Sequence, residues 1–191
     1  MPEPHQRCFW VGSDPLMIAY HDDEWGTPCH DDRKLFELLM LDVNQAGLSW
    51  SLVLRKREGY RRAFDSWDAK KVAEYDENDL ARLLADPGII RNRLKIQAAV
   101  RNARALLDVQ RDEGSFDRYL WSFVGGQPLR QHGLTRETIP ARTPESDALS
   151  KDLKRRAFTF VGSTVVYAFM QSVGLVDDHL PECYRYAGHS S

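Results

Sequence analysis

The sequence lacks the features of a secreted or membrane-bound protein. Its 191 residues include only three cysteines, at widely spaced positions, which is too few for a disulfide framework in a chain of this size. The first residues show no basic segment followed by an apolar one, and no apolar run approaches the ~20 residues of a membrane span. We therefore expect a cytoplasmic protein with no membrane-bound part.

The chain also lacks an excess of either charge. Its formal net charge is −2, so overall electrostatics gives no reason to expect a polyanionic partner. Any nucleic-acid contact has to use local clusters of basic residues. One basic stretch is explained more simply as the solvated face of a helix; it comprises Arg55, Lys56, Arg57, Arg61 and Arg62.

Segments with the alternating pattern of β-strands are scarce, whereas helical periodicity is common. Apolar residues recur at spacings of three and four, as at Leu35, Leu38 and Leu39. The pattern predicts an all-α fold, and a chain of this length can form one well-packed domain over residues 1–191. We expect a helical body over 31–174, with helices at 31–45, 49–63, 69–74, 77–85, 93–112, 115–124, 145–156 and 161–174.

The two end segments, residues 1–30 and 175–191, are rich in aromatic residues and read as irregular. Chain ends usually fray unless something holds them, so a link between them is expected. Cys8 and His21 lie in the first segment, and His179 and Cys183 lie in the last. Two thiolates and two imidazoles suit tetrahedral zinc, and four protein ligands would leave no open position, as in a structural site. On spacing alone a chance scatter explains these residues equally well, and Cys29-His30 is a competing ligand pair.

A turn between two helical patterns has the composition of a nucleic-acid contact. Residues 86–93 read Asp-Pro-Gly-Ile-Ile-Arg-Asn-Arg, and Gly88 permits a tight turn that directs backbone N–H groups outward. The next helix would start near Asn92, and helix N-termini bind phosphate. Arg91, Arg93 and Lys95 add positive charge. The alternative is an ordinary helical hairpin with a solvated basic face.

A carboxylate is predicted to point into the interior. Asp42 follows Leu35 by seven residues, so both lie on the same face of the helix over 31–45. A buried carboxylate needs a partner or a polar pocket, although Asp42 could instead satisfy N–H groups at the helix end. Aromatic residues could line a slot beside it and would suit a planar, electron-poor ligand; they are Trp10, Tyr20, Trp25 and Trp50. Such residues are also common in ordinary cores.

At these residues the chain resembles the bacterial type I DNA-3-methyladenine glycosylases, members of the helix-hairpin-helix superfamily. The resemblance extends over nearly the whole length. It is carried by Cys8-Phe9-Trp10-Val11, Tyr20-His21-Asp22, Glu24-Trp25-Gly26, Gln45-Ala46-Gly47-Leu48-Ser49-Trp50, Gly88-Ile89-Ile90-Arg91, Ser146-Asp147-Ala148-Leu149-Ser150 and Phe160-Val161-Gly162-Ser163-Thr164.

The resemblance implies a role for several groups of residues. It implies one structural zinc ion on Cys8, His21, His179 and Cys183, which sets Cys29 and His30 aside. It implies a helix-hairpin-helix motif near 77–112 that grips the phosphates of double-stranded DNA, through Gly88, Ile90, Arg91, Asn92 and Lys95. Gly47 and Leu48 would probe the gap in the duplex. The base pocket maps to Asp42, Tyr20, Trp50 and Trp10.

Two positions depart from the family pattern. The family has glutamate, usually followed by glycine, where this chain has Asp42-Val43, and it often has a second tyrosine where this chain has Met17. The resemblance implies a monomeric enzyme that hydrolyses the N-glycosidic bond of 3-methyladenine. The shorter carboxylate leaves two alternatives, a catalytically weakened or lesion-sensing homologue and an enzyme with a shifted base preference.

Overall fold

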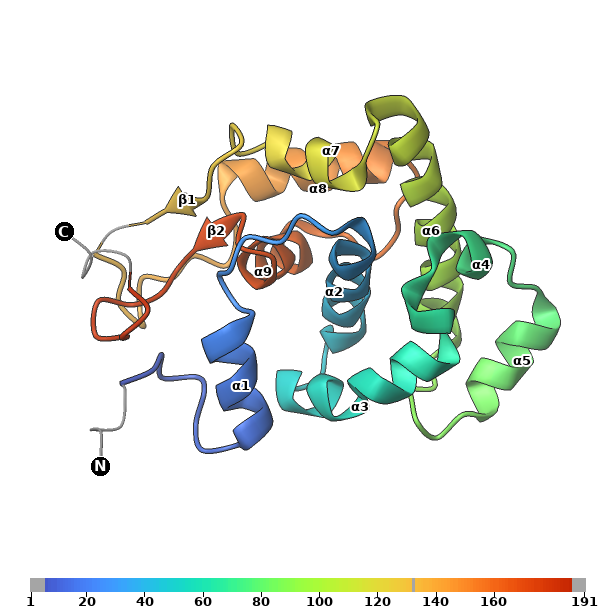
Figure 1. Cartoon of the computed structure of the whole chain (residues 1–191), viewed down its shortest axis with the longest axis horizontal. Helices are drawn as coiled ribbons and strands as arrows, with labels where there is room; N and C mark the ends of the chain where they lie inside the picture. The colour runs from blue at the N-terminus through green and yellow to red at the C-terminus, as the bar shows by residue number, and fades with distance from the viewer. Residues whose placement is uncertain (1–5, 132, 187–191) are drawn as a thin grey trace.

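The computed structural model describes residues 6–131 and 133–186, and within these ranges it is mostly helical (Figure 1). The predicted all-α fold is confirmed, and each predicted helix is present with ends within two residues of the prediction. The helices are α1 (Pro15–Asp23), α2 (Asp32–Gln45), α3 (Trp50–Ala63), α4 (Ala69–Ala73), α5 (Glu77–Ala85), α6 (Arg93–Glu113), α7 (Phe116–Ser122), α8 (Pro144–Arg155) and α9 (Ser163–Ser172).

Side-chain caps set most of the helix starts. Thr143 accepts a hydrogen bond from the backbone of Ser146, and Pro144 occupies the first position of α8, where its missing N–H costs nothing. The same use of a short polar side chain recurs at Asp14, Asp31, Ser49, Asp68, Asp76, Asn92 and Ser115. The helix boundaries are therefore encoded locally.

Four short elements differ from the prediction. The first end segment was predicted to be irregular but contains α1, which Asp14 caps and Pro15 begins. A single turn, η1 (Asp65–Trp67), has φ angles of 50° to 61° at its three residues, a left-handed conformation with no periodic signature. Strands β1 (Leu129–Arg130) and β2 (Val176–Asp177) form a short parallel pair.

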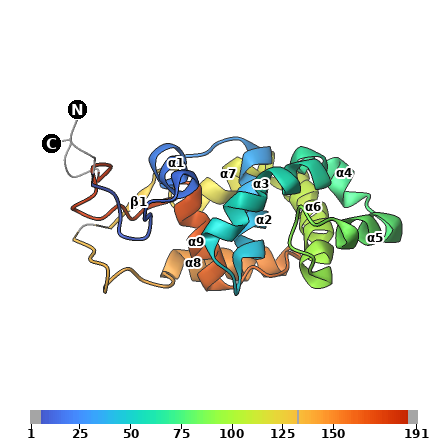
Figure 2. The same ribbon diagram turned by 90° about the horizontal axis from the view of Figure 1, so that it is seen from below.

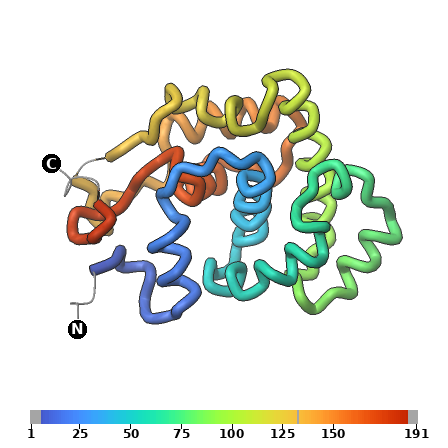
Figure 3. The backbone as a smooth tube through the Cα atoms, viewed as in Figure 1, coloured from blue at the N-terminus to red at the C-terminus, as the bar shows by residue number. Residues whose placement is uncertain are grey.

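Helix α2 forms the centre of the molecule. It contacts α3, α6, α7 and α9, and it lies among them in Figures 1 and 3. Leu35, Phe36, Leu39, Met40 and Leu41 are all completely buried. A helix packed on every side is held rigidly, so polar side chains on α2 have fixed positions.

The two described ends of the chain lie on the same side of the molecule (Figure 2). The backbone N–H of Tyr184 donates to the carbonyl of Gln6 at 2.9 Å. The guanidinium of Arg185 donates to the carbonyls of His21 and Asp22, at 2.8 and 3.0 Å. Hydrogen bonds thus join the segments that the sequence predicted to be linked. Among the described residues, no helix is both long and apolar enough to cross a membrane.

Candidate functional site

A cavity of about 540 Å³ opens where α1, α2, α3 and α9 meet. The four residues predicted to form a base pocket all line it: Asp42, Tyr20, Trp50 and Trp10. Met17 and Trp25 line it too. These side chains come from segments far apart in the sequence, so the fold assembles the cavity.

Aromatic rings form the walls of this cavity. The ring centroids of Tyr20 and Trp50 lie 5.0 Å apart, and those of Trp10 and Trp25 lie 5.0 Å apart. Trp10 and Tyr20 are 6.3 Å apart, which makes the wall continuous. Such rings favour a flat ligand and attract positive charge to their faces.

Asp42 supplies the buried carboxylate of the cavity. Its side chain is only 4% exposed, and the hydroxyl of Ser172 donates to one of its oxygens at 3.0 Å. Burial raises the pKa of Asp42 to about 8, because the Ser172 hydrogen bond only partly offsets the loss of hydration. The carboxyl group is therefore poised to ionise when a cationic or hydrogen-bond-donating ligand arrives.

Two further polar groups belong to this cavity. Burial raises the pKa of Tyr20 well above its usual value, and the nearby Asp42 raises it further, so Tyr20 remains a neutral phenol. The indole N–H of Trp50 is buried and has no acceptor among the described residues. A buried donor without an acceptor costs free energy, which a ligand atom could recover.

The sequence analysis missed several residues that line or support the cavity. Ala168 and Gln171 of α9 line it, and Ser172 holds Asp42. Their spacing of three and four residues places them on one helix face, which was the available signal. The sequence did not reveal that this face of α9 packs against α2.

The predicted metal ligands lie close together at the joined ends. The ligand atoms of Cys8, His21 and Cys183 are within 4.8 Å of one another, and Cys183 Sγ is 3.3 Å from His21 Nε2. The ring centroid of His179 lies 5.2 Å from that of His21. Cys29 does not belong to this group; its backbone N–H donates to the carbonyl of Val173.

Both histidines have the same hydrogen-bond arrangement. His21 Nδ1 is 2.8 Å from Asp22, and His179 Nδ1 is 2.7 Å from Asp177. His179 Nε2 is buried without a hydrogen-bond partner among the described residues. A carboxylate on one ring nitrogen fixes the orientation of the other nitrogen, as in zinc-binding histidines.

The predicted hairpin lies between α5 and α6. Asn92 caps α6 by accepting from the backbone N–H of Lys95 at 3.2 Å. The side chains of Arg91 and Arg93 are exposed. Among the described residues, the structure assigns no acceptor to the backbone N–H groups of Arg91 and Arg93. These groups remain available to an anion.

Three hairpin groups that were predicted to contact DNA have hydrogen-bond partners inside the protein, and their DNA-binding role stays a prediction. Lys95 does not face solvent: it is 7% exposed, and its ammonium donates to the carbonyls of Asn44 and Ala46. The backbone N–H of Ile90 donates to the hydroxyl of Tyr60, and that of Gly88 donates to Asp86, so neither is directed outward. Adjacency in sequence suggested a shared role, but among the polar residues of this run Arg91, Asn92 and Arg93 are exposed and Lys95 is buried.

The loop between α2 and α3 passes the cavity. Gly47 has a φ of +81°, a left-handed conformation that glycine adopts without strain. Leu48 beside it is 38% exposed, although it is a large apolar residue. The loop therefore presents an apolar side chain to the surface near the residues that line the cavity.

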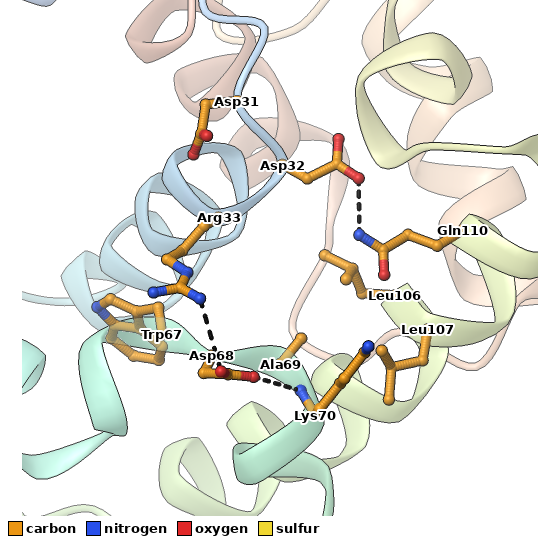
Figure 4. A pocket seen from close by; sticks show the side chains of 10 residues that line it. All are labelled: Asp31, Asp32, Arg33, Trp67, Asp68, Ala69, Lys70, Leu106, Leu107 and Gln110. Carbon is orange, nitrogen blue, oxygen red and sulfur yellow. Dashed lines mark hydrogen bonds and ion pairs between the residues drawn. The ribbon is translucent and has the colours of Figure 1, made fainter.

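A second hollow, of about 360 Å³, lies between the start of α2, η1 and α6 (Figure 4). Its carboxylates already serve the fold. Asp31 caps α2, Asp68 caps α4, and Asp32 accepts from the backbone N–H groups of Phe116 and Asp117 at the start of α7. Helix capping accounts for this acidic cluster.

The aromatic lining and buried carboxylate of the first cavity are typical of the class of proteins that bind a planar, electron-poor or cationic ring. Comparison with known proteins narrows this class. Residues 10–186 match the family model described as methyladenine glycosylase. DNA-3-methyladenine glycosylase 1 of Escherichia coli (strain K12) is 52% identical over 96% of this chain and 98% of its own length.

Solved structures agree with this assignment. A crystal structure of 3-methyladenine DNA glycosylase I superposes with a TM-score of 0.92 at 52% identity, covering 95% of this chain and all of the other. The enzyme from Staphylococcus aureus, solved to explain its recognition of 3-methyladenine, gives 0.91 at 37% identity and covers 94% of this chain and 96% of its own. The chain belongs to the methyladenine glycosylase family.

Proposed function

We propose that the protein hydrolyses the N-glycosidic bond of 3-methyladenine in alkylated DNA, as the first step of base-excision repair. The observation that carries this proposal is the buried carboxylate of Asp42 inside an aromatic cavity. Family membership and about 50% identity to enzymes named for this activity support it. They favour an active enzyme over a lesion-sensing homologue.

The cavity residues suit the chemistry of this lesion. The damaged nucleotide has to leave the base stack, which costs less for a damaged base. Methylation at N3 makes the attached base cationic, so its departure neutralises a charge and needs little acid catalysis. The aromatic faces of Tyr20 and Trp50 hold the ring, and Asp42 accepts hydrogen bonds from its amino edge. Water then attacks an oxocarbenium-like sugar, and the proton it releases goes to solvent.

The proposal predicts a direct assay. The native protein should release free 3-methyladenine from methylated duplex DNA and nothing from unmethylated DNA. Asp42→Glu lengthens the carboxylate by one methylene, a shift of about 1 Å, and tests the consequence of the shorter side chain. If the native protein releases no base and Asp42→Glu restores release, the chain is a weakened or lesion-sensing homologue. A panel of alkylated bases separates a shifted preference from weak activity.

We also propose that Cys8, His21, His179 and Cys183 hold one structural zinc ion. Support comes from three clustered ligand atoms, from the unpartnered His179 Nε2, and from the carboxylate behind each imidazole. These residues would hold the segments carrying Trp10 and Tyr20 against α2. A zinc ion held by these four residues would supply a cross-link between the chain ends.

Metal analysis tests this site with a matched control. We expect one zinc per chain in the native protein, loss of the zinc in Cys183→Ser, and full content in Cys29→Ser. Less than one zinc in the native protein, or unchanged content in Cys183→Ser, contradicts the site. Strong chelation should lower the unfolding temperature of the native protein and leave that of Cys183→Ser unchanged.

The DNA surface rests on the hairpin and on the α2–α3 loop. Arg91, Asn92 and Arg93, with the free N–H groups beside them, are proposed to bind phosphates of double-stranded DNA. Gly47 and Leu48 are proposed to fill the gap left by the flipped base. The helix-hairpin-helix classification, the monomeric state and the cytoplasmic location remain predictions.

A further inference from the structure

A buried tyrosine joins the hairpin to the helix that carries Asp42. Tyr60 of α3 is 1% exposed, and its hydroxyl donates to Asn44 Oδ1 at 2.8 Å. The same hydroxyl accepts from the backbone N–H of Ile90 at 3.2 Å. Asn44 follows Asp42 by two residues and is itself 4% exposed. One phenol therefore links the proposed phosphate grip to the end of α2.

Lys95 provides a second link between the same two parts. Its ammonium donates to the carbonyls of Asn44 and Ala46, each at 2.8 Å. Lys95 lies in the first turn of α6, directly after the hairpin, and a cation at the last carbonyls of α2 is favoured by the helix dipole. Burying an ammonium group is costly, so these two hydrogen bonds are needed to hold Lys95 in place. Lys95 thus ties the start of α6 to the segment that leads into Gly47 and Leu48.

The hairpin also rests against α3 with no space between them. A Cβ atom added at Gly59 would lie 2.2 Å from the carbonyl oxygen of Gly88. Lys56, on the same face of α3, donates from its ammonium to the carbonyl of Pro87 at 2.8 Å. The hairpin cannot shift along α3 without breaking these contacts, so α3 transmits its position to Asn44.

We propose that Tyr60, Asn44 and Lys95 form a positioning network that sets the distance between the phosphate-gripping hairpin and the base pocket. None of the three lines the cavity. A flipped nucleotide spans a fixed length from its phosphates to its base, so both ends are engaged only when this distance is right. The inference rests on the proposed function. It assigns to these three residues the role of aligning the base pocket with the phosphate-binding hairpin.

The network is tested by measuring base binding and DNA binding separately, and then base excision, which needs both. Tyr60→Phe removes only the hydroxyl, and Lys95→Met removes the ammonium but keeps the length of the side chain. We expect affinity for free 3-methyladenine and for undamaged duplex DNA to stay within ~3-fold, while single-turnover excision falls at least ~10-fold, because misplacement near 1 Å is that costly. A purely structural role would change all three in proportion to the loss of folded protein.

Two matched controls lie outside the network. Tyr75→Phe also removes a phenol, one that donates to Asp65 at 2.6 Å, and Arg104→Met removes a cation of α6 that donates to the carbonyl of Ala73. Both should excise at the native rate. Tyr60→Phe decides the test if Lys95→Met does not fold.

Two results overturn the inference. One is that the native protein releases 3-methyladenine and Tyr60→Phe releases it at the same rate. This result would overturn the network and leave the proposed function intact. The other is a loss of excision matched by equal losses in both affinities. Absence of release by the native protein would overturn the proposed function and the inference together.

Discussion

Two buried carboxylates on α2 differ in the partners that the fold gives them. Glu37, 6% exposed, accepts hydrogen bonds from the guanidinium groups of Arg57 and Arg61, the latter at 2.8 Å. Asp42, 4% exposed, accepts from one hydroxyl, that of Ser172. The fold therefore gives Glu37 two cationic partners and gives Asp42 none among the described residues. Asp42 is thus buried without a cationic partner in the part of the chain that the structure describes, whereas Glu37, five residues earlier on the same helix, has two. This difference indicates that Asp42 is kept for binding a ligand.

The pKa values of the two regions differ in the same sense. Glu24 shares Arg57 with Glu37; burial alone would raise its pKa, but hydrogen bonds from Arg57 and Lys34 lower it to about 2. Burial raises the pKa of Asp42 to about 8. In the ion-pair cluster of Glu24, Lys34, Glu37, Arg57 and Arg61, hydrogen bonds therefore stabilise the charged state of Glu24, whereas the pocket stabilises the neutral state of Asp42.

The largest effect is expected from breaking the balanced pair. Glu37→Gln removes one of the two carboxylates that pair with the buried Arg57 and leaves Glu24 as the other, and we expect a loss of about 3 kcal/mol in the free energy of unfolding. Urea denaturation at pH 7 measures it. The folded fraction should still excise 3-methyladenine at a native rate. A loss below about 1 kcal/mol would show that the cluster contributes little.

A smaller effect is expected in the pH dependence of excision. Asp42 of the free enzyme is mostly protonated below pH 8, and the cationic lesion needs the carboxylate. We expect kcat/KM to rise about tenfold per pH unit between pH 6 and 7 and to level off above pH 8. A steady-state pH profile measures this. A flat profile from pH 6 to 8 would contradict the raised pKa.

The smallest effect is expected in the stability of Asp42→Asn. The pKa of Asp42 is higher in the folded state than in the unfolded one, so the folded state binds more protons between about pH 4 and 8 and loses stability as the pH rises through this range. Asp42→Asn removes that loss. We expect the free energy of unfolding of the variant, measured relative to that of the native protein, to increase by at least about 2 kcal/mol from pH 5 to pH 9. Parallel urea titrations test it, and identical pH slopes would refute it.

The sequence predicted the helices well because their signals are local. Caps such as Thr143 and Asn92 need only a few residues to act. Asp42 was predicted to point inward from its spacing to Leu35, and it does. The signal for α1, Asp14 followed by Pro15, was equally local but was overlooked.

What the sequence could not provide was the packing between elements. Lys95 follows Arg91 and Arg93 in a basic run, yet it turns inward, because the end of α2 lies beside the first turn of α6. Ser172 sits 130 residues from Asp42, so no periodic pattern could pair them. The linear sequence predicts which residue types the site uses, and tertiary contacts decide which of them reach it.

The central claim is that Asp42 is buried in order to bind the base. Its most direct test is the rate at which Asp42→Asn releases 3-methyladenine from methylated duplex DNA, measured beside the native protein at equal concentrations of folded enzyme. The account predicts a rate at least ~100-fold lower, with an unfolding midpoint no lower than that of the native protein. Release at the native rate by a folded Asp42→Asn variant would contradict it.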